Sequence, residues 1–327
     1  MRYVIVGAGA VGGTLGAALH FAGRDVTLIA RGQHYEGLRD HGLRFETANG
    51  TLVADIPVAE HPREISYAEG DVALLCVKAH QTDQAIRDLK TAAPESLRVV
   101  CAQNGVANEP RALRSFPEVY GMRVNAPTSH LEPGVVTAHG SPVYGIVDIG
   151  RFPDGHDRFA EHFAVTLNEA GFLAQCVSRI MRWKYYKLLV NLRNAIDTCC
   201  GPGAPGTDEL YELAVSEGHA CLAAAEIDVA TDEEERAQRE AFGLSQPLGG
   251  PAYPGNSSWQ SVVRGQETEV DYLNGEIVLL GRCNGIPVPV NTRLQEEMHR
   301  LVNSRGVPGQ LSPSALMSSQ RLSRKLT

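Results

Sequence analysis

Short apolar runs of strand length alternate with helical segments along the first half of the chain. Residues 3–6, 25–29, 71–77 and 97–102 form such runs, and most of their positions are apolar. Nearly continuous apolar runs of this length are typical of parallel strands that helices cover on both faces. Strands that alternate with helices therefore predict an α/β fold built on a doubly wound parallel sheet.

Two further segments of the first half alternate apolar and polar residues. Residues 41–62 surround Asn49-Gly50, a pair that favours tight hairpin turns, so they predict a small hairpin or strand pair at one edge of the sheet. Residues 134–140 and 143–149 predict antiparallel strands that complete the first domain.

Helical periodicity begins near Asp157 and dominates the rest of the chain. We therefore predict an N-terminal domain over residues 1–177 and an all-helical C-terminal domain over residues 178–327. The acidic run 232–235 predicts a solvated helix start, since negative charge is favourable there. The serine-rich segment from Ser304 predicts a loosely held tail.

The turn after the first strand carries the pattern G-x-G-x-x-G and opens a helix. Gly7 permits the tight turn, Gly9 lets the backbone approach a pyrophosphate, and Gly12 lets the helix pack close to the strand. Amides at the helix N-terminus can then bind the anion. The turn predicts a Rossmann-type dinucleotide-binding unit. Its candidate cofactor residues are Gly7, Ala8, Gly9, Ala10, Val11 and Gly12.

The end of the second strand indicates which dinucleotide is bound. NAD enzymes usually have Asp or Glu there for the ribose 2′-hydroxyl, whereas this chain has Ala30-Arg31. The Arg31 guanidinium can form two charge-assisted hydrogen bonds with a 2′-phosphate. The sequence therefore predicts NADP, and the alternative is that Arg31 is a solvated loop cation.

Polar residues also follow the next two strands, with Lys78 after one and Gln103-Asn104-Gly105 after the other. Ligands of open α/β sheets bind at the carboxyl ends of the strands. Lys78 and Asn104 are therefore predicted to border the cofactor. The alternatives are a surface cation for Lys78 and an ordinary turn residue for Asn104.

The composition limits the partners of the protein. The chain has 327 residues and 43% hydrophobic content, enough for the cores of two domains. A formal net charge of -8 and the absence of a long basic run argue against nucleic acid or an anionic membrane as partner. No apolar stretch reaches the roughly 20 residues of a membrane span, and no signal peptide precedes the first strand, so we expect a cytoplasmic protein.

Cysteine and histidine patterns indicate no redox or metal site. The seven cysteines include no C-x-x-C pair, and adjacent Cys199 and Cys200 are poorly placed to bridge. We expect reduced, buried thiols. His139 has no triad or metal-ligand set nearby, so no role is assigned to it.

A polar stripe marks the first helix predicted in the second domain. Lys187, Asn191 and Asn194 lie at i, i+4 and i+7, with Trp183 on the same stripe. Asparagine is a poor helix former, so two beside a lysine favour the lining of a cleft. The alternative is the wet face of an amphipathic helix.

Two more candidates lie downstream, Ser257 and Glu269. Each has a structural alternative. Ser257 could cap a helix, and Glu269 lies within Thr268-x-x-Asp271, which resembles a capping box.

Together these residues resemble the ketopantoate reductase family of NADP-dependent 2-oxoacid reductases, over nearly the whole chain. The motifs that carry the resemblance are Gly7, Gly9 and Gly12 with Arg31, Val77-Lys78, Gln103-Asn104-Gly105, Trp183 with residues 187–191, Ser257, residues 268–275 and residues 285–291.

The resemblance implies a role for each candidate of the second domain. Lys187 would be the general acid that protonates the substrate carbonyl oxygen, while Asn191 and Asn194 hold the substrate. Ser257 would bind the substrate carboxylate, and Glu269 would lie between the substrate and the nicotinamide ribose.

Two departures from the family pattern concern substrate recognition. The second asparagine of the family usually lies eight residues after the lysine, where this chain has Ala195, and Asn194 comes one residue earlier. A one-residue offset turns a side chain by about 100° around a helix. The family pattern Ser-Met-x-x-Asp is here Ser257-Ser258-x-x-Ser261. Arg193, among apolar residues, requires an anionic partner.

The leading hypothesis is an NADPH-dependent reductase of a small 2-oxoacid, either 2-dehydropantoate or a related substrate, that acts as a monomer or homodimer. A rival within enzymes is an NADP-dependent imine or opine-type reductase, which would reduce a C=N bond. A catalytically silent NADP-binding sensor is the alternative outside enzymes, and the stripe that begins at Lys187 argues against it.

Overall fold

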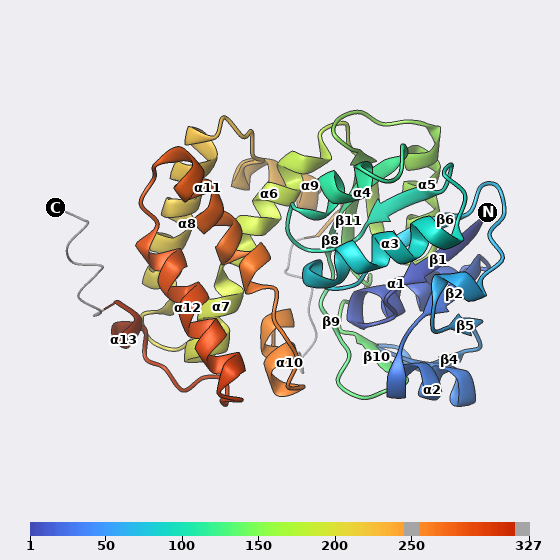
Figure 1. Ribbon diagram of the computed structural model, residues 1–327, viewed down its shortest axis with the longest axis horizontal. Helices are drawn as coiled ribbons and strands as arrows, with labels where there is room; N and C mark the ends of the chain where they lie inside the picture. Colours follow the sequence, from blue (N-terminus) through green and yellow to red (C-terminus); the bar gives the residue numbers. More distant parts are fainter. Residues whose placement is uncertain (245–254, 318–327) are drawn as a thin grey trace. The chain divides into compact units, whose positions relative to one another are not determined.

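The computed structural model describes residues 1–244 and 255–317, which divide into two compact units. Residues 1–184 and 231–244 form the first unit, and residues 185–230 and 255–317 form the second. Figure 1 shows strands in the first unit and helices alone among the described residues of the second.

The first unit is built on an eight-stranded sheet in which all neighbouring strands are parallel except β8 and β11. In spatial order the strands are β12 (Leu173–Cys176), β11 (Ile146–Arg151), β8 (Val119–Asn125), β7 (Arg98–Cys101), β6 (Val72–Leu75), β1 (Arg2–Val6), β2 (Asp25–Ile29) and β5 (Val58–Ala59). The chain extends from β1 first to β2 on one side and later to β6 on the other, which is the order of a doubly wound sheet.

Helices cover both faces of this sheet. Tyr3 and Ile5 of β1 belong to one buried cluster with α1 and α5, whereas Val4 and Val6 belong to a second cluster with α3 and α4. The predicted Rossmann-type sheet is therefore confirmed, and α3 is seen in front of the strands in Figure 1. The helices are α1 (Ala10–Phe21), α2 (Gly32–His41), α3 (Thr82–Ala92), α4 (Asn108–Leu113) and α5 (Arg158–Glu169), with 3₁₀ turns η1 (Pro62–Glu64) and η2 (Ala79–Gln81).

A separate four-stranded sheet has the order β4-β3-β10-β9. β3 (Leu43–Thr47) and β4 (Gly50–Ala54) form the predicted hairpin, but in this sheet rather than at the edge of the large one. β10 (Val135–Ala138) pairs in parallel with β3 and antiparallel with β9 (Thr128–Ser129). Residues 134–140 and 143–149 contain strands with antiparallel neighbours, as predicted, but these strands lie in different sheets, because β11 joins β8 in the large sheet. They do not complete the first domain, since α5 and β12 follow in the same unit.

Asp157 is the N-cap residue of α5, and its substitution tests how much this cap stabilises the protein. Its carboxylate accepts hydrogen bonds from the Ala160 amide at 3.0 Å and from the Tyr120 hydroxyl at 2.7 Å. Burial acts to raise the pKa of Asp157, but these bonds and the nearby Arg151 outweigh it, so the pKa lies below its ordinary value. We expect Asp157→Ala to lower the free energy of unfolding by about 1 kcal/mol at neutral pH, as loss of an N-cap does.

The pH dependence of this loss identifies its cause. Because the folded-state pKa of Asp157 is lowered, the stabilisation is fully present above the ordinary pKa of about 3.9 and is lost as the pH falls through the folded-state value. We expect urea unfolding to show a smaller difference in the free energy of unfolding between wild type and Asp157→Ala near pH 3 than at neutral pH. An equal difference at both pH values would show that the negative charge of Asp157 does not contribute to the stabilisation.

The second unit is all-helical over its described residues, as predicted. Its helices are α7 (Arg193–Cys200), α8 (Thr207–Ala224), α10 (Ser257–Val263), η3 (Val270–Tyr272), α11 (Asn274–Asn284), α12 (Pro289–Asn303) and α13 (Pro313–Met317). α6 (Ile180–Asn191) begins in the first unit and ends in the second. α8, α11 and α12 pack against one another, and α7 packs against α10 and α12.

The observed division differs from the predicted boundary after residue 177, because α9 (Asp232–Ala241) returns to the first unit. Arg123 of β8 is buried, and its guanidinium pairs with buried Asp148 of β11. The same guanidinium bonds Glu235 and Gln238 of α9. Buried charges require partners, so these contacts explain why α9 packs on the sheet.

The acidic run at residues 232–235 begins a helix as predicted, but it is not a solvated face throughout. Thr231 and Glu234 form a capping box, and Glu234 also pairs with Arg182 of α6 at 2.8 Å. Glu235 is largely buried against Arg123. Both carboxylates therefore hold α9 in the first unit.

The segment from Ser304 to Met317 is attached, contrary to the prediction of a loosely held tail. The Gly309 amide donates to the Thr198 carbonyl and the Leu311 amide to the Cys199 carbonyl, each at 2.9 Å. The last carbonyls of a helix lack partners within it, and this segment supplies donors to α7. The end of the predicted tail, residues 318–327, lies outside the described residues.

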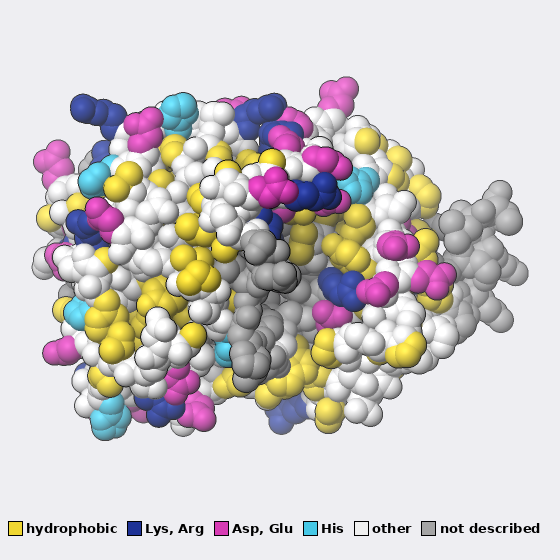
Figure 2. Space-filling view, turned by 180° about the vertical axis from the view of Figure 1, so that it is seen from behind, with side chains coloured by type: hydrophobic (Ala, Val, Ile, Leu, Met, Phe, Trp, Pro, Cys, Tyr) yellow, Lys and Arg dark blue, Asp and Glu magenta, His cyan; other side chains and the backbone are white. Residues whose placement is uncertain are grey.

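The surface carries charges of both signs. On the face shown in Figure 2, the Lys and Arg side chains of the described residues lie among Asp and Glu side chains. No helix in the part of the chain that the structure describes is long and apolar enough to cross a bilayer.

All seven cysteines have free thiols. Burial raises the pKa of Cys76 and of Cys199 to about 12. These thiols are therefore protonated at neutral pH and weakly nucleophilic.

Candidate active site

The turn from Gly7 to Gly12 has the backbone geometry of an anion cradle. Gly7 has a φ of 102°, which favours glycine. A Cβ atom on Gly12 would lie 2.1 Å from the Gly7 carbonyl oxygen, so only glycine lets α1 begin this close to β1. A Cβ atom on Gly9 would meet no atom within 4 Å. The backbone at Gly9 therefore borders open space that can accommodate a pyrophosphate.

His34 of α2 supports this turn, and its role was not anticipated from the sequence. Its Nε2 lies 2.8 Å from the Ala8 carbonyl oxygen, and the Gly134 amide donates to its Nδ1 at 2.9 Å. A ring that donates through Nε2 and accepts through Nδ1 is neutral. His34 thus joins α2, the glycine turn and the segment before β10.

Arg31 directly precedes α2, at the carboxyl end of β2. Its side chain is 63% exposed, and one guanidinium nitrogen pairs with Asp88 of α3 at 3.0 Å. A guanidinium has five N–H donors, so the pair with Asp88 orients Arg31 and leaves donors for a phosphate.

Lys78 and Asn104 lie in the loops after β6 and β7, which are neighbouring parallel strands. The Gln103 side chain donates to the Val77 carbonyl at 2.8 Å, which joins the two loops. The Asn104 carbonyl accepts from the Asn108 side chain at 3.0 Å, which closes the second loop. Both candidates therefore stand on the rim of the sheet where α/β proteins bind ligands.

The polar stripe is divided between two helices, so the predicted continuous helix is wrong. Lys187 and Asn191 lie on the last turns of α6, whereas Asn194 lies on the first turn of α7. Leu192 separates the helices, and its amide donates to the Leu189 carbonyl at 3.2 Å, a tighter turn than an α-helix has. Asn191 is 6% exposed, and Lys187 and Asn194 are half-buried.

Side-chain amides bond to the junction between α6 and α7. The Asn274 side chain donates to the Leu192 carbonyl at 3.5 Å and to Asn291 Oδ1 at 3.0 Å. The Asn291 side chain in turn donates to Glu217 at 2.8 Å. This buried network therefore connects the junction to α11, α12 and α8.

Ser257 is the first residue of α10, which packs against α7. The Asn256 side chain caps α10 and donates to the Asn194 carbonyl at 3.2 Å. Asn256, rather than Ser257, is thus the capping residue, and the capping alternative for Ser257 is wrong. Buried Ser261 donates its hydroxyl to the Ser257 carbonyl at 3.0 Å, so it is bonded within its own helix.

Glu269 directly precedes η3 and is 4% exposed. The capping-box alternative is wrong, because neither Thr268 nor Glu269 caps this turn with its side chain. Asp271 instead accepts a hydrogen bond from Gln295 of α12 at 2.6 Å. η3 leads into α11, which supplies the Asn274 bond to the α6–α7 junction.

Arg193 has the anionic partners that the sequence required. Its guanidinium pairs with Asp208 at 2.5 Å and lies 3.5 Å from Asp197. It also stacks over the Tyr211 ring, 5.2 Å from the ring centre. Arg193 therefore joins α7 to α8, which is a structural role.

The structure places the predicted residues in two groups. The cofactor candidates, from Gly7 to Asn104, all lie in the first unit at the carboxyl ends of β1, β2, β6 and β7. The catalytic candidates, from Lys187 to Glu269, all lie in the second unit, on α6, α7, α10 and the residue before η3. Within the second unit, hydrogen bonds from Asn256 and Asn274 connect these segments.

The chain is similar to known proteins over most of its length. The family described as ketopantoate reductase PanE/ApbA matches residues 3–154, and its C-terminal part matches residues 179–302. A 2-dehydropantoate 2-reductase from Pyrococcus horikoshii is 30% identical over 302 residues, 89% of this chain and 94% of that protein. The chain belongs to the ketopantoate reductase family. Its class is therefore that of oxidoreductases that act on a CH–OH/C=O pair.

Solved structures of similar proteins share the fold. The PanE/ApbA family ketopantoate reductase from Ralstonia eutropha JMP134 has a TM-score of 0.78 at 28% identity, covering 93% of this chain and 99% of its own. A D-mandelate dehydrogenase in ternary complex with NADH and anilino(oxo)acetate has a TM-score of 0.81 at 26% identity, with the same coverage. The predicted family and fold are confirmed.

Proposed function

We propose that this family member is an NADPH-dependent reductase of a small 2-oxoacid and that Lys187 donates the proton. The supporting observation is that Lys187 lies one turn before buried Asn191 on α6. Lys187 is the only lysine among the described residues of the second unit. Arginine cannot donate a proton at physiological pH, so Lys187 is the one primary ammonium acid available there.

The chemistry follows from the charge that develops during reduction. NADPH, when bound, would supply the hydride. The carbonyl oxygen gains negative charge as its carbon is reduced, and the Lys187 ammonium stabilises this charge and transfers a proton to the oxygen. The alcohol product thereby leaves without a charged oxygen, and Lys187 regains a proton from water.

Other side chains of the second unit would hold the substrate. Asn191 and Asn194 carry amide donors and acceptors for the substrate's polar groups. The Ser257 hydroxyl donates to the substrate carboxylate. Glu269 accepts hydrogen bonds from a hydroxyl of the substrate or of the nicotinamide ribose, and its burial fixes its position.

The cofactor residues of the first unit fit a dinucleotide with a 2′-phosphate. Gly9 borders the open space that a pyrophosphate requires, and Arg31 presents an exposed guanidinium at the end of β2. Lys78 and Asn104 would border the nicotinamide end of the cofactor. The D-mandelate dehydrogenase relative was crystallised with NADH. Arg31 is the reason for proposing NADPH in this chain.

The substrate would be 2-dehydropantoate or a related 2-oxoacid. The Pyrococcus horikoshii relative is named for 2-dehydropantoate, and the D-mandelate dehydrogenase holds anilino(oxo)acetate, another 2-oxoacid. Ala195 is buried, so no amide stands at the position of the family's second asparagine. This difference favours a related oxoacid over 2-dehydropantoate itself.

Oxidation of NADPH at 340 nm with a panel of 2-oxoacids, with and without added amines, tests the proposal. Turnover with at least one oxoacid in the absence of amine is the expected result. Turnover that requires an amine would show an imine reductase, and cofactor binding without any turnover would show a sensor. Size-exclusion chromatography of the same protein decides between a monomer and a homodimer.

A further inference from the structure

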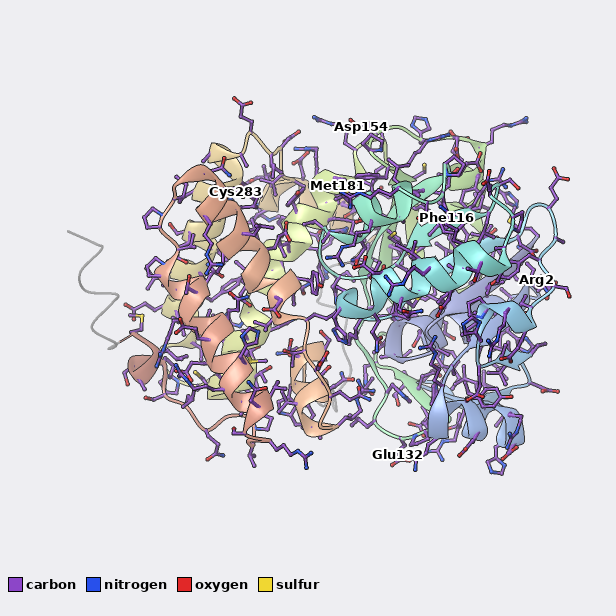
Figure 3. The ribbon with its side chains drawn as sticks, viewed as in Figure 1. Arg2, Phe116, Glu132, Asp154, Met181 and Cys283 are labelled. Carbon is purple, nitrogen blue, oxygen red and sulfur yellow. The ribbon has the colours of Figure 1, made fainter. Side chains whose placement is uncertain are left out.

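We propose that Lys184 is a positioning residue that, together with Glu109, holds the Gln103-Asn104-Gly105 turn in the conformation that binds the nicotinamide cofactor. This inference rests on the proposed function, because it assigns a support to the predicted cofactor residue Asn104. All of its contacts lie within the first unit. Figure 3 labels Met181, in the first turn of the helix that carries Lys184.

The Lys184 ammonium has three acceptors, one for each of its protons. It donates to the Gln103 carbonyl at 3.0 Å, to the Cys101 carbonyl at 3.5 Å, and to a Glu109 carboxylate oxygen. Lys184 is 3% exposed and Glu109 is fully buried. Two of the three acceptors are thus backbone oxygens of the chain that leaves β7 and leads into the Asn104 turn.

A pair of glycines allows α6 to come close enough for this contact. Gly121 of β8 and Gly150 of β11 face each other across the two strands. A Cβ atom on either would lie 3.1 Å or less from Ile180, the first residue of α6. Larger residues here would push the start of α6 away from the sheet, and Lys184 lies just over one turn further along the same helix. The two glycines therefore leave room on the sheet for this part of α6.

Lys184 is one of several groups that bond to the turn. The Asn104 carbonyl accepts from Asn108, and the Gln103 side chain donates to Val77, but the Gln103 carbonyl is held by Lys184. Gly105 has a φ of 76°, so the backbone reverses at once after Asn104. Loss of the ammonium would leave the two carbonyls of residues 101 and 103 buried without this donor, and the turn would shift to find another.

The variant Lys184→Met/Glu109→Leu removes the ion pair without leaving an isolated buried charge. Replacing a buried ion pair with apolar residues of similar volume often leaves stability unchanged, so this variant is expected to fold. We expect the Kd for NADPH, measured by fluorescence titration without substrate, to rise about tenfold, because small displacements of binding groups are costly. The KM for the oxoacid at saturating NADPH should stay near the wild-type value.

Two controls separate positioning from stability. Phe163→Leu opens a cavity in the buried cluster beside α5 and should lower the melting temperature without changing the Kd for NADPH. Lys184→Met alone, measured below its melting temperature, should show the same rise in Kd as the double variant, since burial already raises the pKa of Glu109 and favours its neutral form once the ammonium is gone.

An unchanged Kd for NADPH in folded Lys184→Met or in the double variant overturns the inference. A rise in Kd that Phe163→Leu reproduces at equal loss of melting temperature also overturns it, because general destabilisation then suffices. A wild-type protein that binds NADPH but reduces no 2-oxoacid refutes the proposed reaction alone, and the ratio of Kd values still decides the role of Lys184.

Discussion

Lys187→Ala should lower kcat for oxoacid reduction by a factor of about 10² to 10⁴, the usual contribution of a positioned general acid. The Kd for NADPH should stay near the wild-type value, because the candidate residues for the pyrophosphate and the 2′-phosphate lie in the other unit. Stopped-flow or steady-state oxidation of NADPH with the best oxoacid measures the first quantity, and fluorescence titration measures the second.

Lys187→Arg separates proton transfer from charge stabilisation. Arginine keeps the positive charge but cannot give up its proton at these pH values, so it should restore substrate binding and little of kcat. Recovery of wild-type kcat in Lys187→Arg would show that charge alone suffices and that the proton comes from elsewhere. Full activity of Lys187→Ala would remove Lys187 from the mechanism.

The large sheet was predictable because its signal is local. Each parallel strand is an apolar run covered on both faces, and the turn from Gly7 to Gly12 stands where a strand meets a helix. The small sheet was not predictable in the same way, because β10 pairs with β3, about ninety residues earlier in the chain. Alternation shows that a segment is a strand, but it does not identify the partner.

The return of α9 to the first unit has a signal that was present but overlooked. Arg123 and Asp148 are charged residues inside otherwise apolar strand segments, and buried charges require partners. Charged residues in such strand segments therefore predict that a further element packs on the sheet and supplies their partners. It does not show that Glu235 and Gln238 will supply the bonds, since an acidic helix start has the same composition whether it is solvated or buried.

The residues of the candidate site could be predicted from the sequence, but their arrangement in space could be predicted only in part. Lys187 and Asn191 lie on one helix as expected, but α6 ends at Asn191, and the junction at Leu192 is bonded by Asn274, over eighty residues later in the chain. Periodicity describes a regular helix and does not show that one helix ends and another begins within the same polar stripe. Lys184 was overlooked for a related reason, because a lysine one turn before Lys187 has no distinguishing feature until its acceptors are known.

Arg31→Ala should raise the KM for NADPH by a factor of about 10 to 100 and leave the KM for NADH nearly unchanged. Hydrogen bonds to charged groups contribute about 1.5–3 kcal/mol, and each 1.4 kcal/mol corresponds to a factor of ten. Only NADPH carries the 2′-phosphate that the guanidinium would bind. Steady-state kinetics with both cofactors at a fixed oxoacid concentration measure the ratio.

Two further variants distinguish a specific phosphate contact from an effect of net charge. Arg39 lies on α2, the helix that follows Arg31, and its exposed guanidinium pairs with Asp40, so Arg39→Ala removes one positive charge without a predicted cofactor contact. Asp88→Asn keeps a hydrogen-bond acceptor for Arg31 but removes a negative charge that competes with a phosphate, so NADPH affinity should stay equal or rise. Equal losses for Arg31→Ala and Arg39→Ala would mean that net charge, rather than a specific phosphate contact, sets the cofactor preference. A loss of NADPH affinity in Arg31→Ala alone would show that the residue at the end of β2 selects NADPH.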